Sequence, residues 1–232
     1  MAIKKPIDAR PLVSIVTPSY NSEKYIAETI ASVQQQTVTD WELLIVDDAS
    51  SDATVTKIKR LQAEDSRIKC FSLKENKGPA HARNLGIQKA RGKYLTFLDA
   101  DDLWFPEFLE RSSTEAKMHP FVFASYKRLD ENLEPYLSDF IVPEKVSYTD
   151  ILKSNSISCL TAFLDIEVLG KKYMPLIKKR QDMGLWLQYL KKTNYAYGIQ
   201  EPLAIYRIRR DSLSRNKTGL IKHQWKFYRE VE

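Results

Sequence analysis

The sequence has only two cysteines and no long hydrophobic run. Cys70 and Cys159 lie far apart and without metal-ligand spacing, so they indicate neither a disulfide framework nor a cysteine-based metal site, and a reducing compartment is the default. No apolar run approaches the length of a membrane span, and the polar, basic start from Met1 to Arg10 does not resemble a signal peptide. We therefore expect a soluble cytoplasmic protein.

A strong excess of one charge is also absent. The 232 residues include 36 lysines and arginines and 30 aspartates and glutamates, which gives a net charge of +6. Nucleic-acid binders usually carry a larger excess, so we expect no nucleic-acid partner. The value fits an anionic small ligand, or light peripheral contact with an acidic membrane face. A hydrophobic share of 43% is enough for one large domain, or one domain with a substantial appendage.

The most informative stretch is an acidic cluster that follows an apolar run. Tyr94–Leu98 is predicted to be a buried strand, and three carboxylates follow within four positions, at Asp99, Asp101 and Asp102. Enclosed like charges repel one another and lose hydration, and a bound cation is the simplest remedy. In an extended segment Asp99 and Asp101 point the same way, which suits Mg²⁺ or Mn²⁺. The alternative is a solvated acidic turn.

Strand-like and helix-like segments alternate through the first half of the chain. Apolar runs predict strands at 12–17, 41–46, 67–73 and 94–98. Three helices are predicted between these strands. The first is expected to have Asn21 or Ser22 as its N-cap, the second to have Asp52, and the third to begin at Gly78. This order predicts an α/β fold with a mostly parallel central sheet and helices on both faces. Ligands of such sheets bind beyond the carboxyl ends of the strands, where the polar clusters fall.

The second half has a different, α+β pattern. Helices are predicted over 107–118, 148–153 and 182–192, strands over 121–127 and 158–164, and one or two strands over 195–207, with an irregular stretch or edge hairpin over 132–146. Leu220 to Glu230 predicts a basic, aromatic helix. That helix would either lie on a membrane surface or pack on the protein or a second copy of it.

Four loops, taken in this order, resemble the family-2 inverting glycosyltransferases with the GT-A (Rossmann-like) fold. The matching stretches are Val13–Asn21, Ile45–Ser50, Asn76–Gly86 and Phe97–Asp102, with weaker similarity at Gln181–Trp186 and Pro202–Arg207. The resemblance covers nearly the whole chain to about residue 215. Within this family, the chain most resembles small bacterial enzymes of capsule, teichuronic acid or lipopolysaccharide synthesis.

The resemblance implies a nucleotide-sugar site at these loops. Pro18 and Tyr20 would hold the nucleobase and ribose, with Tyr20 offering a ring face for stacking. Asp48 would accept a hydrogen bond from a uracil imide, so the donor is expected to be UDP-linked. Arg83 would face phosphate or brace the acidic loops. On position alone, Tyr20 is as readily a core tyrosine, and Arg83 a solvated charge.

For the Asp-X-Asp cluster, the resemblance implies a divalent ion. Asp99 and Asp101 would bind Mn²⁺ or Mg²⁺ bridging the diphosphate, with Asp101 the surer ligand, and the metal would assist departure of the nucleoside diphosphate. Asp47 would be structural, capping backbone N–H groups. Asp102 would cap the following turn.

Inversion requires a base that deprotonates the acceptor hydroxyl. The family has an acidic pair before a helix with an Asp/Leu/Trp pattern, and here Gln181 replaces the first acid, which leaves Asp182 as the base. By position alone, Asp182 is rather an N-cap of the helix. Trp186 is either a core residue or an acceptor contact.

A basic run follows the last predicted strand. After the pair Tyr206-Arg207, where the family often has a histidine, this chain has Arg209 and Arg210, so that three arginines lie close together. These arginines would contact the diphosphate if a loop closes on it, and the alternative is a basic surface run.

We therefore expect a single GT-A domain in three parts: 1–105 binds the nucleotide sugar, 106–215 binds a glycan or lipid-linked acceptor, and 216–232 forms the basic helix. The expected activity is inverting, metal-dependent sugar transfer in bacterial surface polysaccharide synthesis. Two alternatives remain: a nucleotidyltransferase, which would need a glycine-rich loop after the first strand, and a non-catalytic nucleotide-binding module, which the replacement at Gln181 leaves open.

Overall fold

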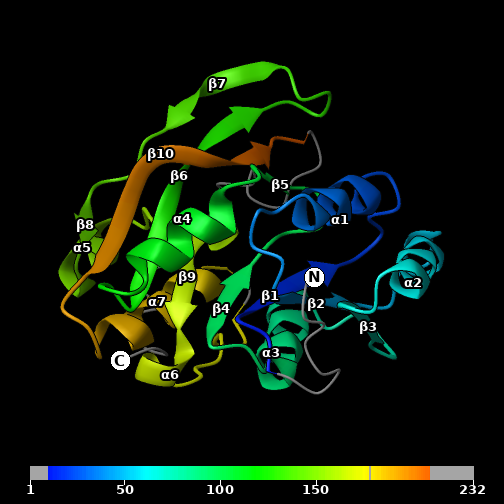
Figure 1. Ribbon diagram of the computed structural model, residues 1–232, viewed down its shortest axis with the longest axis horizontal. Coiled ribbons are helices and arrows are strands. Elements are labelled where there is room, and N and C mark those ends of the chain that lie inside the picture. Colours follow the sequence, from blue (N-terminus) through cyan, green and yellow to red (C-terminus); the bar gives the residue numbers. More distant parts are fainter. Residues whose placement is uncertain (1–9, 178, 210–232) are drawn as a thin grey trace, which may run out of the picture.

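The structure is a computed structural model that describes residues 10–177 and 179–209. Parallel strands form the first half of its sheet, in the spatial order β3-β2-β1-β4. They are β1 (Val13–Ser19), β2 (Trp41–Asp47), β3 (Ile68–Ser72) and β4 (Tyr94–Phe97), and the helices α1 (Ile26–Gln34), α2 (Thr54–Glu64) and α3 (Pro79–Lys89) connect them (Figure 1). The predicted α/β architecture is confirmed.

The sheet continues beyond β4 with mixed strand directions. β9 (Phe163–Asp165) runs antiparallel to both β4 and β6 (Phe121–Leu129), and so joins the two halves of the chain. Next come β10 (Ala196–Arg207), parallel to β6, and the edge strand β5 (Leu103–Trp104). The shorter strands β7 (Pro135–Phe140) and β8 (Lys145–Val146) pair with β6 and β10. The remaining helices are α4 (Phe108–Glu115), α5 (Tyr148–Lys153), a 3₁₀ helix (Cys159–Thr161), α6 (Ile166–Leu169) and α7 (Gln181–Leu190).

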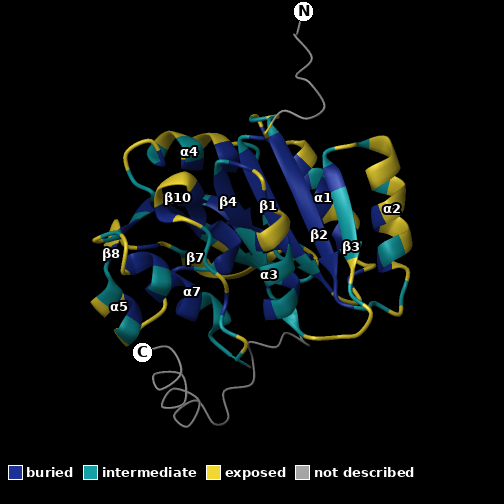
Figure 2. Ribbon diagram, turned by 90° about the horizontal axis from the view of Figure 1, so that it is seen from below, coloured by how far each residue is buried: buried dark blue, intermediate teal, exposed yellow. Residues whose placement is uncertain are grey.

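The core consists of two apolar layers, one on each face of the sheet. Successive side chains of a strand point to opposite faces, so Ile15 and Val16 belong to different layers. The layer of Ile15 includes side chains of α1, α2 and α4, and the layer of Val16 includes side chains of α3, α5 and α7. Figure 2 shows the buried strands between helices with exposed outer faces. Both faces are apolar because helices cover both.

Some local predictions are wrong. The expected strand at 158–164 is a 3₁₀ helix followed by the short β9, because the Ser158 hydroxyl accepts from the Leu160 N–H and closes a tight turn. α1 has Tyr25 at its N-cap and no side-chain cap, so neither Asn21 nor Ser22 caps it. The cap predicted at Asp52 survives in altered form: its carboxylate accepts from the Thr54 N–H, although the N-cap position is Ala53.

Other predictions for the second half have mixed outcomes. The stretch 132–146 does not form a hairpin by itself: β7 pairs with the preceding strand β6, and β8 pairs with β10. The stretch expected to form one or two strands is the single strand β10, whose register is irregular between Ile199 and Pro202, where proline lacks an N–H. The tail helix expected at 220–230 lies outside the described residues. Among the described helices, none has the length and apolar character needed to cross a membrane.

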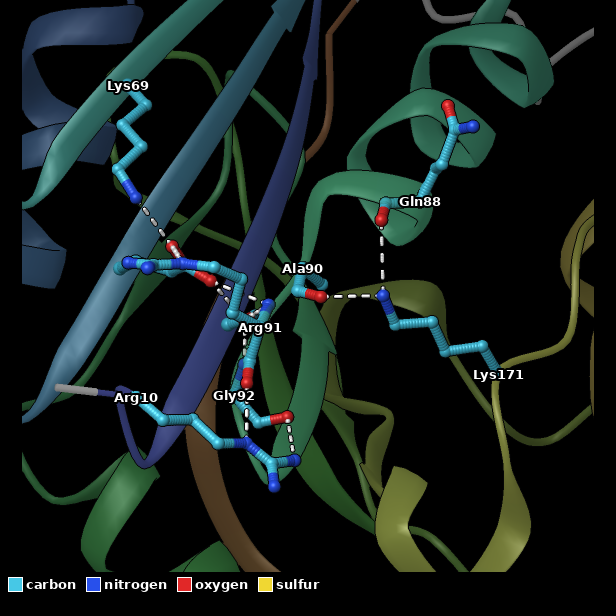
Figure 3. A network of polar contacts seen from close by, with 9 residues as sticks. Arg10, Lys69, Gln88, Ala90, Arg91, Gly92 and Lys171 are labelled. Carbon is cyan, nitrogen blue, oxygen red and sulfur yellow. Dashed lines mark hydrogen bonds and ion pairs between the residues drawn. The ribbon is translucent and has the colours of Figure 1, made fainter. Parts of the chain in front are cut away.

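The helix α3 is held in place at two points. At its carboxyl end, Lys171 donates to the carbonyls of Gln88 (3.1 Å) and Ala90 (2.6 Å), beside a network in which the buried Glu42 accepts from Arg91 and Lys69 (Figure 3). In its middle, Gly86 packs so closely on β1 that a Cβ would lie 2.3 Å from the nearer Val16 methyl. Glycine is therefore required for this approach.

Gly86→Ala should lower the free energy of unfolding by about 1–3 kcal/mol, because overpacking against Val16 outweighs the better helix propensity of alanine. Urea denaturation measures the effect. Gln88→Ala, at an exposed position of the same helix, is the control and should be neutral. Equal stability of Gly86→Ala and wild type would show that the helix has room to shift.

Candidate active site

A cavity of about 570 Å³ lies beyond the carboxyl ends of β1, β2 and β4. This is the edge at which the sequence predicted a ligand site. Its lining includes most of the predicted site residues, namely Pro18, Tyr20, Asp48, Arg83, Asp99, Asp101, Arg207 and Arg209. Segments far apart in the sequence therefore meet in one cavity.

Short polar contacts position the loops after β1 and β2. The Asp48 N–H donates to the Ser19 carbonyl (2.8 Å), and the side chain of Asn21 accepts from the Ser51 N–H (2.9 Å). Asp47 accepts from the N–H of Ser50 (3.0 Å), which confirms the structural role predicted for it. Tyr20, between these anchors, is 51% exposed, so its ring is available to a ligand.

Asp48 is a buried carboxylate with both oxygens engaged. Its Oδ1 accepts from the N–H of Lys77 (2.8 Å) and its Oδ2 from the N–H of Gly78 (2.7 Å). Gly78 has a φ of 87°, a conformation that favours glycine, and it directly precedes α3. Asp48 thereby fixes the entry of the chain into the helix that carries Arg83.

The acidic cluster forms a turn and not the extended segment that the alternation argument assumed. The Asp102 N–H donates to the Asp99 carbonyl (3.1 Å), so Asp99 to Asp102 reverse direction. Each cavity-facing carboxylate has an arginine partner: Arg83 donates to Asp99 Oδ1, and Arg209 Nη1 lies 2.9 Å from Asp101 Oδ2. The charge that seemed to demand a bound cation is offset by two guanidinium groups. Burial, and then the charge of Asp99, raise the pKa of Asp101.

Asp102 has a different role from its two neighbours. It is 1% exposed, and its Oδ1 accepts from the backbone N–H of Arg207 (2.8 Å), on β10. The prediction that it caps the following turn is wrong, because the donor comes from a distant strand. Burial, reinforced by the charges of Asp101 and Asp99, raises the pKa of this carboxyl well above its usual value.

Arg207 and Arg209, the two arginines of the basic run that the structure describes, are held in place by contacts with α1 and the residues just before it. The Arg207 guanidinium is buried, pairs with Glu28 (2.6 Å) and lies 4.7 Å from the ring centre of Tyr25. Arg209 lies 5.2 Å from the same ring while it contacts Asp101. α1 and the residues just before it therefore hold the end of β10 against the acidic turn. Arg210 lies outside the described residues.

Asp182 occupies the first turn of α7, outside the lining of this cavity. Arg180, just before the helix, has a left-handed backbone with a φ of 62°. Burial raises the pKa of Asp182, and the charges of Arg83 and Asp99 act on it from the cavity side. Asn155 Nδ2 donates to Asp182 Oδ2 (3.0 Å).

Trp186, one turn further along α7, is fully buried against Phe97 and Phe121. Its indole N–H donates to the carbonyl of Ile157 (3.1 Å). Of the two interpretations from sequence, the geometry favours the core residue over the acceptor contact.

The donor set of the acidic turn fits a hard divalent cation. Within residues 10–177 and 179–209, no group of three or more histidine, cysteine or acidic side chains could hold a metal. Asp99 and Asp101, however, present carboxylate oxygens to one cavity. Magnesium-type sites often use one or two carboxylates and complete their shell with water and substrate phosphates. The two residues therefore suffice if a phosphate ligand is bound.

Sequence reasoning missed several residues of the site. Asn76, Gly78 and Tyr206 line the cavity, and Asn155 contacts Asp182. The three cavity residues lie in stretches that resemble the family, Asn76–Gly86 and Pro202–Arg207, which was a usable signal. Nothing in the sequence around Asn155 connects it with a residue 27 positions away.

Comparisons with known sequences agree on one family. The sequence profile of glycosyl transferase family 2 matches residues 14–160. TuaG of Bacillus subtilis (strain 168), named as a teichuronic acid biosynthesis glycosyltransferase, is 43% identical over 227 residues, which cover 96% of this chain and 89% of TuaG. WfgD of Escherichia coli, named UDP-Glc:alpha-D-GlcNAc-diphosphoundecaprenol beta-1,3-glucosyltransferase, is 38% identical over 217 residues, which cover 92% of this chain and 84% of WfgD.

Solved structures share the fold at lower identity. S. aureus TarS 1–349 in complex with UDP-GlcNAc has a TM-score of 0.72 at 22% identity, and the match covers 86% of this chain but only 59% of the TarS chain. The mannosyltransferase PcManGT from Pyrobaculum calidifontis, in complex with GDP-Man and Mn²⁺, has a TM-score of 0.68 at 21% identity, covering 97% of this chain and 68% of the other. These likenesses confirm the GT-A fold.

Asp48→Asn should loosen the loop that precedes α3, because an amide NH₂ cannot accept from a backbone N–H. We expect the free energy of unfolding to fall by about 1–3 kcal/mol, and the Lys77 and Gly78 amides to exchange hydrogen faster. Urea denaturation and hydrogen exchange measure these effects. Asp139→Asn, on the exposed strand β7, is the control. Unchanged stability and exchange in Asp48→Asn would contradict the anchoring role.

Proposed function

This chain belongs to glycosyl transferase family 2, and from that premise we propose that it transfers a sugar, with inversion, from a UDP-sugar to a glycan or lipid-linked acceptor in bacterial surface polysaccharide synthesis. The observation that carries the proposal is the cavity at the carboxyl edge of the sheet, where an exposed aromatic ring, the buried Asp48, three arginines and three further carboxylates meet. That set offers a partner to each part of a nucleoside diphosphate.

The nucleoside lies at the ends of β1 and β2. Tyr20 offers its ring to the base, and Pro18 lies beside it. Each Asp48 oxygen already accepts one backbone N–H, and a carboxylate oxygen has a second lone pair, with which it accepts from the uracil imide. UDP is also the nucleotide in the WfgD name and in the TarS complex.

The diphosphate lies at the acidic turn, where Asp99 and Asp101 would hold Mn²⁺ or Mg²⁺. When bound, the metal offsets the negative charge that builds up on the departing UDP. Arg83 holds Asp99 in place, and Arg209, now on Asp101, is within the cavity and available to a phosphate oxygen. The Mn²⁺ in the PcManGT complex supports this use of the fold.

Asp182 is the general base. Its carboxylate takes the proton of the acceptor hydroxyl, the hydroxyl oxygen bonds to the anomeric carbon, and the bond from that carbon to the diphosphate oxygen breaks, with the electron pair leaving on UDP. Attack opposite the leaving group inverts the anomeric centre. The pKa of Asp182, raised by burial, makes it a stronger base than a solvated aspartate, while activity falls when the pH drops below that pKa.

A non-catalytic nucleotide-binding module is the second candidate, and one observation favours it. Gln181, which replaces the first acid of the family pair, donates to the carbonyl of Ile177 (2.6 Å) and supports the loop before α7. An amide in this place contributes no proton transfer. The turnover experiment below separates the two candidates. Peripheral contact with the membrane rests on the sequence of residues 217–229 and the lipid-linked acceptor in the WfgD name.

Asp182→Asn should lower turnover by about 10²- to 10⁴-fold and leave UDP affinity unchanged, because the base acts on the acceptor and not on the nucleotide. The assay measures UDP release from UDP-glucose and UDP-N-acetylglucosamine with a GlcNAc-diphosphate-lipid acceptor and Mn²⁺. Proton NMR of the product reads the anomeric configuration, expected to be β from an α-linked donor.

Asp139→Asn is the matched control, since it makes the same substitution on the exposed strand β7. Retention of configuration would contradict the proposed inversion. UDP binding without turnover on any UDP-sugar would favour the non-catalytic module.

A further inference from the structure

Asn155 lies in the segment between α5 and the 3₁₀ helix, 27 residues before its partner Asp182. Its Nδ2 donates to Asp182 Oδ2 at 3.0 Å. Asn155 is exposed, whereas Asp182 is only partly exposed and its carboxyl group is enclosed, so the pair joins the protein surface to a desolvated carboxylate. An amide N–H is the natural donor here because it stabilises a carboxylate without neutralising it.

The segment that carries Asn155 is anchored to α7 itself. Asn155 Oδ1 accepts from the Ile157 N–H (3.3 Å), and the Ile157 carbonyl accepts from the indole N–H of Trp186 (3.1 Å). Ile157 and Trp186 are both buried. Two contacts with α7 therefore hold the side-chain amide of Asn155. Its Nδ2 contacts the carboxylate of Asp182 at the start of α7, and Ile157, which contacts its Oδ1, is hydrogen-bonded to Trp186 on the following turn of the same helix.

The other groups that act on Asp182 come from different elements. Its carboxylate accepts from the Met183 N–H on α7, and the charges of Arg83 on α3 and Asp99 after β4 act on it in opposite directions. The Cys159 thiol, on the 3₁₀ helix, lies in the same electrostatic neighbourhood. Within the described chain, Asn155 is the side chain whose hydrogen bond to this carboxylate the structure shows.

We propose that Asn155 is the positioning residue of Asp182: its amide fixes the orientation of the carboxylate and stabilises the anionic form that accepts the proton of the acceptor hydroxyl. The inference rests on the proposed role of Asp182 as the base. It adds a residue of the acceptor half that acts through Asp182 and touches neither the nucleotide nor the acid turn.

The electrostatic consequence has a definite sign. Burial raises the pKa of Asp182, and the hydrogen bond from Asn155 lowers it. Loss of the amide donor therefore raises this pKa further, so that a larger fraction of the enzyme is protonated and inactive at a given pH below neutrality. The acidic limb of the pH–rate profile moves to higher pH.

Asn155→Asp separates the two contacts of the amide, since it keeps an oxygen for the Ile157 N–H and removes the N–H that faces Asp182. We expect kcat to fall about tenfold with KM for the UDP-sugar within about twofold, and the acidic limb to move up by about one pH unit. Asn155→Ala, which loses the donor without adding charge, should move the limb in the same direction by less. Asn194→Asp, at an exposed position beyond the end of α7, is the control and should change neither kcat nor the position of the acidic limb.

The assay is UDP release from UDP-glucose between pH 5 and 9, and thermal unfolding confirms that each variant is folded. An acidic limb that stays in place in folded Asn155→Asp and Asn155→Ala would overturn the inference. If Asp182→Asn retains wild-type turnover, the assignment of Asp182 as the base fails, and a UDP-sugar that gives no turnover with the native chain would instead contradict the proposed function. If Asn155→Asp does not fold, the position of the acidic limb in the pH–rate profile of Asn155→Ala alone tests the inference.

Discussion

Enclosing neighbouring carboxylates requires compensating positive charge, and this requirement organises the site. The turn from Asp99 to Asp102 brings three acidic residues to the cavity, and one of them, Asp102, is almost fully buried. Arg83 reaches Asp99 from α3, and Arg209 reaches Asp101 from the end of β10. Because α3 belongs to the first half of the chain and β10 to the second, the acidic turn joins both halves at the point where the ligand is proposed to bind. A divalent ion brought by a nucleoside diphosphate would share these carboxylates with the guanidinium groups that already offset their charge.

Much of this arrangement could be predicted from the sequence because it depends on local patterns. The strands β1 to β4 are apolar runs, each followed by polar residues, and parallel strands bring those residues to one edge. The partners across the site could not be predicted in the same way. The contacts of Arg209 with Asp101, of Arg207 with Asp102 and of Asn155 with Asp182 join positions far apart in sequence, and an arginine or asparagine in a loop has too many available partners.

The wrong predictions have physical causes of the same kind. The stretch at 158–164 is apolar enough for a strand, but hydroxyl groups at Ser158 and Thr161 take up backbone partners and favour a 3₁₀ turn. The extended geometry assumed for the acidic cluster ignored the turn that follows β4. Trp186 could be placed in the core or in the acceptor site because a tryptophan on an amphipathic helix suits both, and only its packing against Phe97 and Phe121 decides.

We propose that the acidic turn binds the diphosphate of UDP through a divalent ion. Calorimetric titration of UDP, with and without Mn²⁺, tests it most directly on the native chain, on Asp101→Asn and on the control Asp139→Asn. We expect binding in the micromolar range that requires Mn²⁺ and that weakens at least about tenfold in Asp101→Asn, with the control unchanged. Equal UDP affinity without metal, or no loss in Asp101→Asn, would contradict the metal-bridged diphosphate, and no UDP binding in the presence of Mn²⁺ would contradict the uridine assignment as well.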